Sequence, residues 1–281
     1  MNIIEMVKEG LRIARTSKSL WLYGFFVGLS LEGSNQGHAP GAPHAIAGVP
    51  HAFTGAAALL GMALLVFTVL GVFMYFVSEG ALIEGVTRIR RGKPPTVHEG
   101  WRDGLAHWGV LFRIAAIYLS TTVASLIVLA APALLAQKLS GSTLAVTLAV
   151  PAVLIAAPWL VTLYMWQAFA ARIAVLENRR ALDAIGKARL FLHGRLLQGL
   201  KLMIAAVLGR MFVLLAGLIA LGVAALAIFV VMKVLGMTYA AVPVIALGAI
   251  VLLPMVFIVV AISGTTQSSI WTIGYLTQEG K

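Results

Sequence analysis

The chain has 281 residues, of which 60% are hydrophobic and only 11% charged, and so few charges cannot cover the surface of a soluble fold of this size. The formal net charge of +11 does not indicate nucleic-acid binding, because the basic residues flank long apolar runs. The absence of cysteine excludes disulfides, thiolate metal sites and a cysteine nucleophile.

The basic residues lie almost entirely on one side of the apolar runs. Of the 21 Lys and Arg residues, 19 fall in the segments 8–18, 88–113 and 172–210 or at position 281, and only Lys138 and Lys233 lie elsewhere. This alternation is typical of a polytopic membrane protein that obeys the positive-inside rule. The sequence therefore predicts an all-α, single integral membrane domain over residues 1–281, a helical bundle in a bacterial or archaeal cytoplasmic (inner) membrane.

Residues 1–16 are predicted to form an amphipathic helix in the membrane interface, with Ile4 and Val7 on its apolar face and Lys8 on the other. Residues 19–31 follow as a short first span. A helix of 13 residues is about 20 Å long, less than the roughly 30 Å hydrocarbon core. The charge distribution favours crossing, because the basic residues divide 19 to 2 between the two sides if it crosses and 15 to 6 if it does not.

The remaining spans are separated by turns and by polar segments. An external loop at 32–54 precedes the second span. A polar connection at 78–108 contains a helix stop, the segment 88–95, and a second amphipathic stretch around Trp101 and Trp108. Six transmembrane helices, together with the amphipathic interfacial helices, place both termini in the cytoplasm. The predicted spans are about 19–31, 55–77, 109–136, 143–171, 198–232 and 241–275.

One segment resembles a pattern in known membrane families. Its residues are Val175, Leu176, Glu177 and Asn178, followed by Ala181, Ala184, Ala188, Phe191 and Leu197. They resemble bacterial multi-span families of unknown function, including the membrane domain found fused to glycerophosphodiester phosphodiesterases. The resemblance implies a helical membrane module with an accessory or regulatory role. It does not imply phosphodiesterase activity, because no such catalytic domain is present in the 281 residues.

Several charged residues near the span ends are candidates for a functional polar site. Glu79 and Glu84 end the second span, where an acidic pair is either a proton or cation site or a partner for interfacial arginines. Glu84 precedes Arg88 by four residues, the favourable order for a helical ion pair. Arg172 and Glu177 allow the same two interpretations.

Arg113 and Arg210 lie inside the starts of predicted spans. A charge in the membrane is costly, so each either extends its side chain to the interface or pairs with Glu84 or Glu177.

The sixth span contains the polar run 263–269, which includes Gln267. This run either lines a polar cavity or marks where the helix emerges into the interface, with Trp271 and Tyr275 as an aromatic belt. The predicted polar site thus comprises Glu79, Glu84, Arg113, Arg172, Glu177, Arg210 and Gln267.

Three histidines of the external loop, His38, His44 and His51, are weak candidates for metal binding, because imidazole binds zinc, copper and nickel. Their spacing matches no compact site, and a flexible loop is the preferred interpretation. The sequence contains no recognisable catalytic motif and indicates no cofactor. An enzyme acting on lipids would need Glu79, Glu84 and Glu177 to converge with His107 or His193.

The preferred functional hypothesis is a non-enzymatic accessory or structural subunit of a membrane complex. Its expected partners are other membrane subunits or further copies of the chain, together with anionic lipid headgroups on the cytoplasmic side. The alternatives are a small-solute or lipid transporter and an intramembrane lipid-acting enzyme. The residues expected to contact anionic lipids are Arg12, Arg15, Lys18, Arg88, Arg90, Arg91, Lys93, Arg179, Arg180, Arg189 and Arg195.

Overall fold

The computed structural model describes residues 3–29, 51–140, 142–234 and 241–280, and every regular element among them is a helix. The elements in chain order are α1 (Ile3–Thr16), the 3₁₀ turn η1 (Lys18–Leu20), α2 (Trp21–Leu29), α3 (His51–Arg90), α4 (Val97–Ser140), α5 (Ser142–Leu176), α6 (Ala181–Leu192), α7 (Leu196–Val234) and α8 (Ala241–Glu279).

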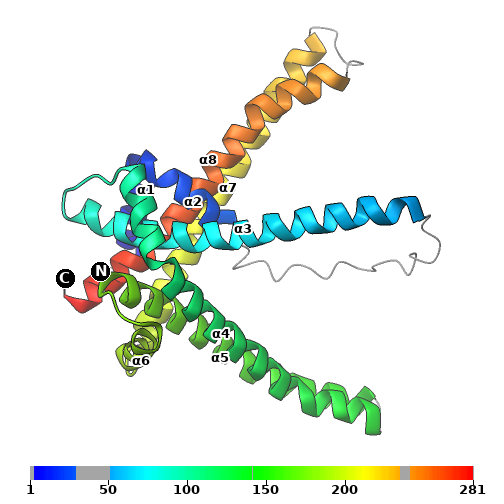
Figure 1. Cartoon of the computed structure of the whole chain (residues 1–281), viewed down its shortest axis with the longest axis vertical. Helices are drawn as coiled ribbons and strands as arrows, with labels where there is room; N and C mark the ends of the chain where they lie inside the picture. Colours follow the sequence, from blue (N-terminus) through cyan, green and yellow to red (C-terminus); the bar gives the residue numbers. More distant parts are fainter. Residues whose placement is uncertain (1–2, 30–50, 141, 235–240, 281) are drawn as a thin grey trace.

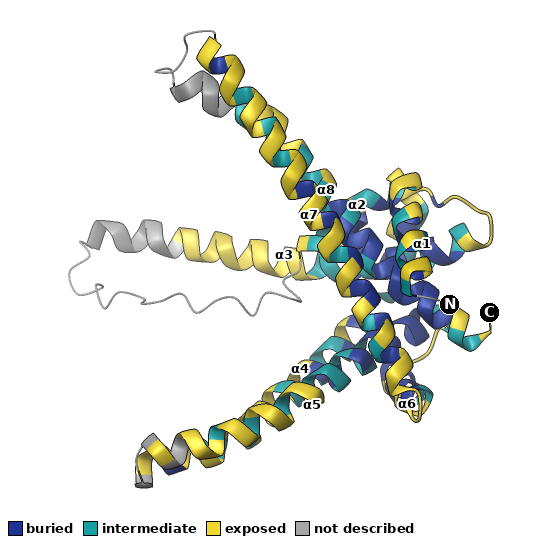
Figure 2. Cartoon of the chain, turned by 180° about the vertical axis from the view of Figure 1, so that it is seen from behind, coloured by how far each residue is buried: buried dark blue, intermediate teal, exposed yellow. Residues whose placement is uncertain are grey.

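Three arms diverge from a common hub (Figure 1). The arms are the outer part of α3, the antiparallel hairpin of α4 with α5, and the hairpin of α7 with α8. Both chain ends lie at the hub, and buried residues gather there, whereas the arms are mostly exposed (Figure 2). We define the hub as α1, η1, α2 and α6 with residues 73–90, 97–118, 161–176, 196–213 and 261–279, and the arms as the outer remainders of the five long helices.

Five helices in the described part of the chain are long and apolar enough to cross a membrane. They are α3, α4, α5, α7 and α8, and they correspond to the second to sixth predicted spans. The prediction of an all-α membrane bundle is therefore confirmed. α2, which covers most of the predicted first span, has nine residues and is not among the five.

The predicted polar connection at 78–108 is helical over most of its length. α3 continues to Arg90 and α4 begins at Val97, so the amphipathic stretch predicted around Trp101 is the first part of α4. The extension is stabilised because its apolar side chains, such as Ile83, are fully buried in the hub. The predicted helix stop is confirmed, since α3 ends just before Gly92, which has a φ of +76°.

α1 is a helix, as predicted, and its packed face partly matches the predicted one. Val7 packs against the hub core, whereas Ile4 is exposed, and Met6, Gly10 and Ile13 are buried. A Cβ atom at Gly10 would lie 2.7 Å from Cγ1 of Ile270 in α8. The missing side chain at Gly10 therefore decides which face of α1 approaches α8.

The contact between α2 and α8 also depends on glycine. A Cβ atom at Gly264 would collide with the carbonyl oxygen of Gly24 and lie 2.6 Å from the amide nitrogen of Gly28. Backbone atoms cannot move aside as a side-chain end can. The two helices therefore meet at a distance that only glycine permits, as is common between helices in membranes.

Replacing Gly264 by alanine should therefore destabilise the hub by about 3 kcal/mol, the upper end for an overpacked site. The matched control is Gly61→Ala in α3, where nothing lies within 4 Å of the added atom. The control should be neutral or slightly stabilising, because alanine is the better helix former. Thermal unfolding in detergent measures both, and equal midpoints for the two variants would contradict the packing.

Candidate functional site

The polar run of α8 is buried at the centre of the hub. Ser263, Thr265, Thr266, Ser268 and Ser269 are all buried, because α1, α2 and α7 pack on this part of α8. The run is therefore enclosed by protein and does not form an exposed surface. The interpretation of Trp271 and Tyr275 as an interfacial aromatic belt is wrong, since both side chains are fully buried.

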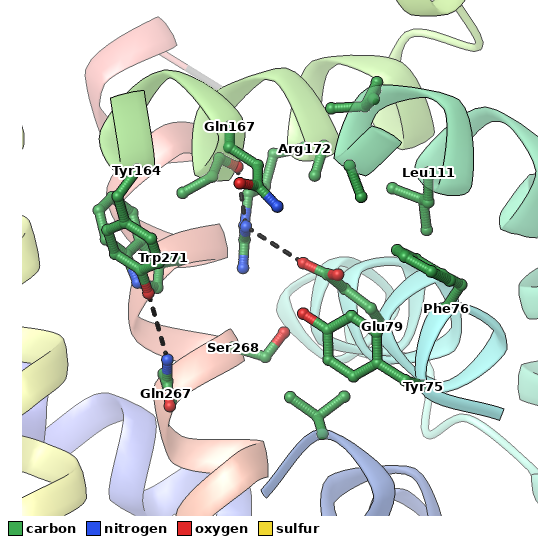
Figure 3. A pocket seen from close by; sticks show the side chains of 15 residues that line it. Tyr75, Phe76, Glu79, Leu111, Tyr164, Gln167, Arg172, Gln267, Ser268 and Trp271 are labelled. Carbon is green, nitrogen blue, oxygen red and sulfur yellow. Dashed lines mark hydrogen bonds and ion pairs between the residues drawn. The ribbon is translucent and has the colours of Figure 1, made fainter. Parts of the chain in front are cut away.

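A buried ion pair joins α5 to α3 beside this run (Figure 3). Nη1 of Arg172 lies 3.5 Å from Oε1 of Glu79, and the same nitrogen donates a hydrogen bond of 2.8 Å to the carbonyl oxygen of Ala168. Arg172 is only 4% exposed. Its guanidinium carbon also lies 5.8 Å from the ring centroid of Trp271, so α3, α5 and α8 meet at one cation.

The ion pair borders a small cavity of about 30 Å³. Glu79, Tyr164, Arg172, Gln267 and Ser268 supply polar groups to its wall. Nε of Arg172 and Oγ of Ser268 are buried and have no hydrogen-bond partner within the described chain. One water needs roughly 10–15 Å³ of such space and a ligand pocket has roughly 300–1,000 Å³, so this cavity suits water rather than a substrate.

Gln267 connects this region to α7. Its Oε1 accepts a hydrogen bond of 2.9 Å from Nη1 of Arg210, and its Nε2 donates one of 3.3 Å to the hydroxyl of Tyr164. Nη2 of Arg210 also donates to the carbonyl oxygen of Gly28 at 3.3 Å. The suggested pairing of Arg210 with Glu84 or Glu177 is therefore wrong, because the hub satisfies Arg210 with an amide and a carbonyl instead.

Glu84 belongs to a separate network at the inner end of α3. Nε of Arg88 lies 3.8 Å from Oε1 of Glu84, as the four-residue spacing predicts. Arg88 also donates a hydrogen bond of 2.6 Å to Oδ2 of Asp103 and lies 3.5 Å from Glu99. The structure therefore separates Glu84 from the cavity that Glu79 lines.

Glu177 belongs to a third network, which fixes α6 and the end of α8 to the end of α5. It accepts hydrogen bonds from Lys187, from Arg179 at 2.7 Å and from the hydroxyl of Tyr275 at 2.8 Å. Lys187 also donates to Oε1 of Glu279 at 3.3 Å. Burial raises the pKa of Glu177. The hydrogen bonds from Lys187, Tyr275 and Arg179 lower it by more than burial raises it, so the pKa is about 2.

The convergence that a lipid-acting enzyme would need is not observed, because Glu79, Glu84 and Glu177 belong to three different networks. Nδ1 of His107 lies 2.9 Å from the carbonyl oxygen of Asp103, in the network of Arg88. No cluster of His, Asp and Glu suitable for a metal occurs among the described residues. His38 and His44 lie outside those residues, and of His51 only the backbone, which begins α3, is described.

Arg113 and the predicted lipid contacts lie at the surface of the hub. Arg113 is exposed, has no ion pair or hydrogen bond within the described chain, and lines a groove together with Arg180 and Asp183. All eleven residues predicted to contact anionic lipid lie in the hub or in the turns that join its helices. Ten of them are exposed, and Arg88 is half-buried in its network with Asp103.

Sequence reasoning missed three participants: Trp271 beside Arg172, Tyr164 beside Gln267, and Lys187 beside Glu177. An aromatic residue in an apolar span gives no sign of whether protein or lipid surrounds it. Lys187 lies ten residues after Glu177, a spacing typical of no single helix contact. Its role depends on the turn at Asn178, which has a φ of 49° and redirects the chain into α6.

Comparisons of the chain with protein-family models, with curated protein sequences and with solved structures found no match. The resemblance noted from the sequence therefore stays an expectation.

Replacing Arg172 by methionine should lower the free energy of unfolding by about 1–3 kcal/mol, because the partly buried carboxylate of Glu79 loses its cation. The double variant Glu79→Gln with Arg172→Met should recover part of the loss. Arg102→Gln removes an exposed cation and should have little effect. Unfolding by SDS in mixed micelles measures all three, and equal losses in the single and double variants would contradict a coupled pair.

The network of Glu177 should persist to strongly acidic pH. Because its pKa is lowered from 4.5 to about 2, the stability that the carboxylate contributes is fully present above pH 4.5 and is lost as the pH falls towards 2. Glu177→Gln should therefore be less stable than the parent at pH 7, and this difference should shrink below pH 4.5. Thermal midpoints over a pH series measure it, and a difference that disappears already at pH 6 would refute the assignment.

Proposed function

We propose that this chain is a non-enzymatic accessory or structural subunit of a larger complex in a bacterial or archaeal inner membrane. In this proposal the hub lies at the cytoplasmic side, the arms cross the bilayer, and both termini are inside. The distribution of charge supports this orientation. The basic clusters belong to the hub, whereas Lys138 and Lys233 lie near the outer ends of two arms.

The path of the chain supports six crossings. α2 ends in the hub at Leu29, while α3 begins at His51, at the far end of its arm (Figure 1). With the hub inside and the ends of the arms outside, Leu29 and His51 lie on opposite sides of the membrane. The proposal of a sixth crossing follows from these two positions, because the five long helices do not account for it.

The subunit role is supported by glycines in the arms at which the described chain leaves room for a side chain. In the hub, glycines such as Gly24, Gly104 and Gly264 lie where any side chain would collide with a neighbouring helix. In the arms, Gly61, Gly71, Gly222 and Gly248 have nothing within 4 Å, whereas Gly217 of α7 packs against Val259 of α8. Two hub glycines, Gly109 and Gly186, are open as well. A glycine inside a helix costs about 1 kcal/mol relative to alanine, and in membranes small residues allow helices to approach closely.

The arm formed by α3 has the most open surface. Residues 59–72 are exposed without exception, so no other described helix packs on this stretch of α3 from any side. Ala216 and Ala220 on α7, part of a face of small residues spaced four apart, are exposed as well. Apolar exposure alone does not require a protein partner in lipid. The open glycines are the observation that supports helices of another membrane subunit beside the arms.

The cavity at Arg172 favours a structural role over a transporter. It does reach Gln267 and Ser268, as the transporter hypothesis requires, but its volume is about 30 Å³. A small-solute permease would have to enlarge it roughly ten-fold to reach the lower limit of ligand pockets. The accessory-subunit proposal needs no such rearrangement.

Site-specific photo-crosslinking in native membranes tests the subunit role. A crosslinking amino acid at Phe67 in α3 or Phe229 in α7 should give one discrete product with the mass of a second membrane protein. The same amino acid at Leu190 in α6, which is 77% exposed but lies in the hub, is the control and should give none. Co-expression of two differently tagged copies distinguishes a second copy of the chain from another subunit.

Gly61 provides a matched variant for the crosslinking experiment. Gly61→Leu should weaken the crosslink at Phe67 by roughly ten-fold, since a large residue separates helices that pack through small ones. It should leave the isolated protein as stable as the parent, because nothing lies within 4 Å of that position. A protein that crosslinks only to lipid at Phe67 and Phe229, and is monomeric in nanodiscs, would refute the proposal.

A further inference from the structure

Arg113 is a cation to which the described chain offers no anionic partner. It lies in α4 at the start of the predicted span 109–136 and within the hub, is exposed, and has no ion pair or hydrogen bond within the described chain. An arginine at the inner end of a membrane span is stabilised by a polar partner or by an anionic lipid headgroup.

Arg113 lies near the inner end of the hairpin that α4 forms with α5. It shares its groove with Arg180 and Asp183, which follow the end of α5 at Leu176. An extended arginine side chain can therefore bring its guanidinium to the level where α5 ends and α6 begins.

The start of α6 brings more positive charge to the same level. Arg180 is the N-cap residue of α6, and no side chain caps this helix end. The amide groups at a helix N-terminus carry partial positive charge, so a cation at this position is unfavourable unless an anion is near. Asp183, in the first turn, has no ion pair within the described chain, so the groove that holds Arg113 and Arg180 has a net charge of +1.

The remainder of the groove is apolar. Its volume is about 630 Å³, and Val110, Phe112 and Ile117 of α4 face Ala181 and Leu182 of α6. A groove whose wall combines apolar side chains with two cations complements an amphiphile with an acyl chain and an anionic head.

We propose that this groove binds an anionic glycerophospholipid of the phosphatidylglycerol class. The phosphodiester lies between Arg113, Arg180 and the first amide groups of α6, and an acyl chain follows the apolar wall formed by Phe112 and Ile117. A single negative charge matches the net charge of the groove. The inference relies on the proposed membrane orientation, not on the subunit role.

Native mass spectrometry of the full chain, with phosphatidylglycerol or phosphatidylethanolamine added to the detergent, tests the site. The double variant Arg113→Gln with Arg180→Gln should retain at least ten-fold less phosphatidylglycerol, since both charge-assisted contacts are lost. The matched control, Arg91→Gln with Lys93→Gln, removes the same charge from exposed positions outside the groove and should change retention less than two-fold. Equal losses in both would show general surface attraction and overturn the proposal.

Two further measurements define the occupant. Asp183→Asn should leave phosphatidylglycerol retention unchanged or raise it, because it removes a like charge. Preference of the parent for phosphatidylethanolamine, lost in Asp183→Asn, would overturn the proposal in favour of a zwitterionic head. Glycerophosphoglycerol, the same headgroup without acyl chains, should compete at least a hundred-fold less well than the lipid, and equal competition would overturn the role of the apolar wall.

A further variant tests the lipid site even if the double variant of Arg113 and Arg180 does not fold. Leu182→Asn changes an exposed side chain of the apolar wall that is not part of the hub core, and it should lower lipid retention several-fold. Unchanged retention in this variant would count against the site. The crosslink at Phe67 is a separate readout that neither set of variants should alter, so failure of the lipid site and failure of the subunit proposal are distinguishable.

Discussion

The arrangement of the whole chain depends on one buried cation. Arg172 of α5 contacts Glu79 of α3 and lies over Trp271 of α8, so one helix from each of the three arms meets at its guanidinium. The neighbouring amide of Gln267 connects α8 to Arg210 of α7. Each of the five long helices except α4 therefore contributes to a continuous polar centre, and α4 is held by its hairpin with α5. The arms can diverge outwards because their inner ends are fixed here.

Small residues determine how closely the helices meet around this centre. Gly24 and Gly264 let α2 lie against the polar run of α8, and Gly10 lets α1 cover the same helix from another side. The hydroxyl groups of that run are thereby enclosed by protein. Thr265 donates a hydrogen bond of 2.8 Å to the carbonyl oxygen of Ala261, whereas the hydroxyls of Ser263, Thr266, Ser268 and Ser269 have no hydrogen-bond partner within the described chain. The short α2 is thus part of the hub's packing as well as the beginning of the proposed first crossing.

The sequence was sufficient for the class of fold and for local contacts. Long apolar runs predicted the five long helices, the segment 88–95 predicted the end of α3, and the spacing of Glu84 and Arg88 predicted their ion pair. It was not sufficient for Arg172 and Glu79, which are 93 residues apart and meet only through tertiary packing. It also misplaced Trp271 and Tyr275, because a buried surface and a lipid-facing surface of a membrane helix are equally apolar. Hydrophobicity therefore does not distinguish the hub from the arms.

The same limitation explains why a polar centre is useful in a membrane. Replacing a buried ion pair by apolar residues is often neutral or stabilising, so the contact between Arg172 and Glu79 is weak evidence for stability. In water, apolar burial would select which helix faces meet, but the arms of the same helices are proposed to cross lipid, which is equally apolar. An ion pair does discriminate, because any other register separates Arg172 from Glu79 inside the protein, where the dielectric constant is low. We infer that this pair specifies which helices meet in the hub, and that the open arms are left available for helices from outside the chain.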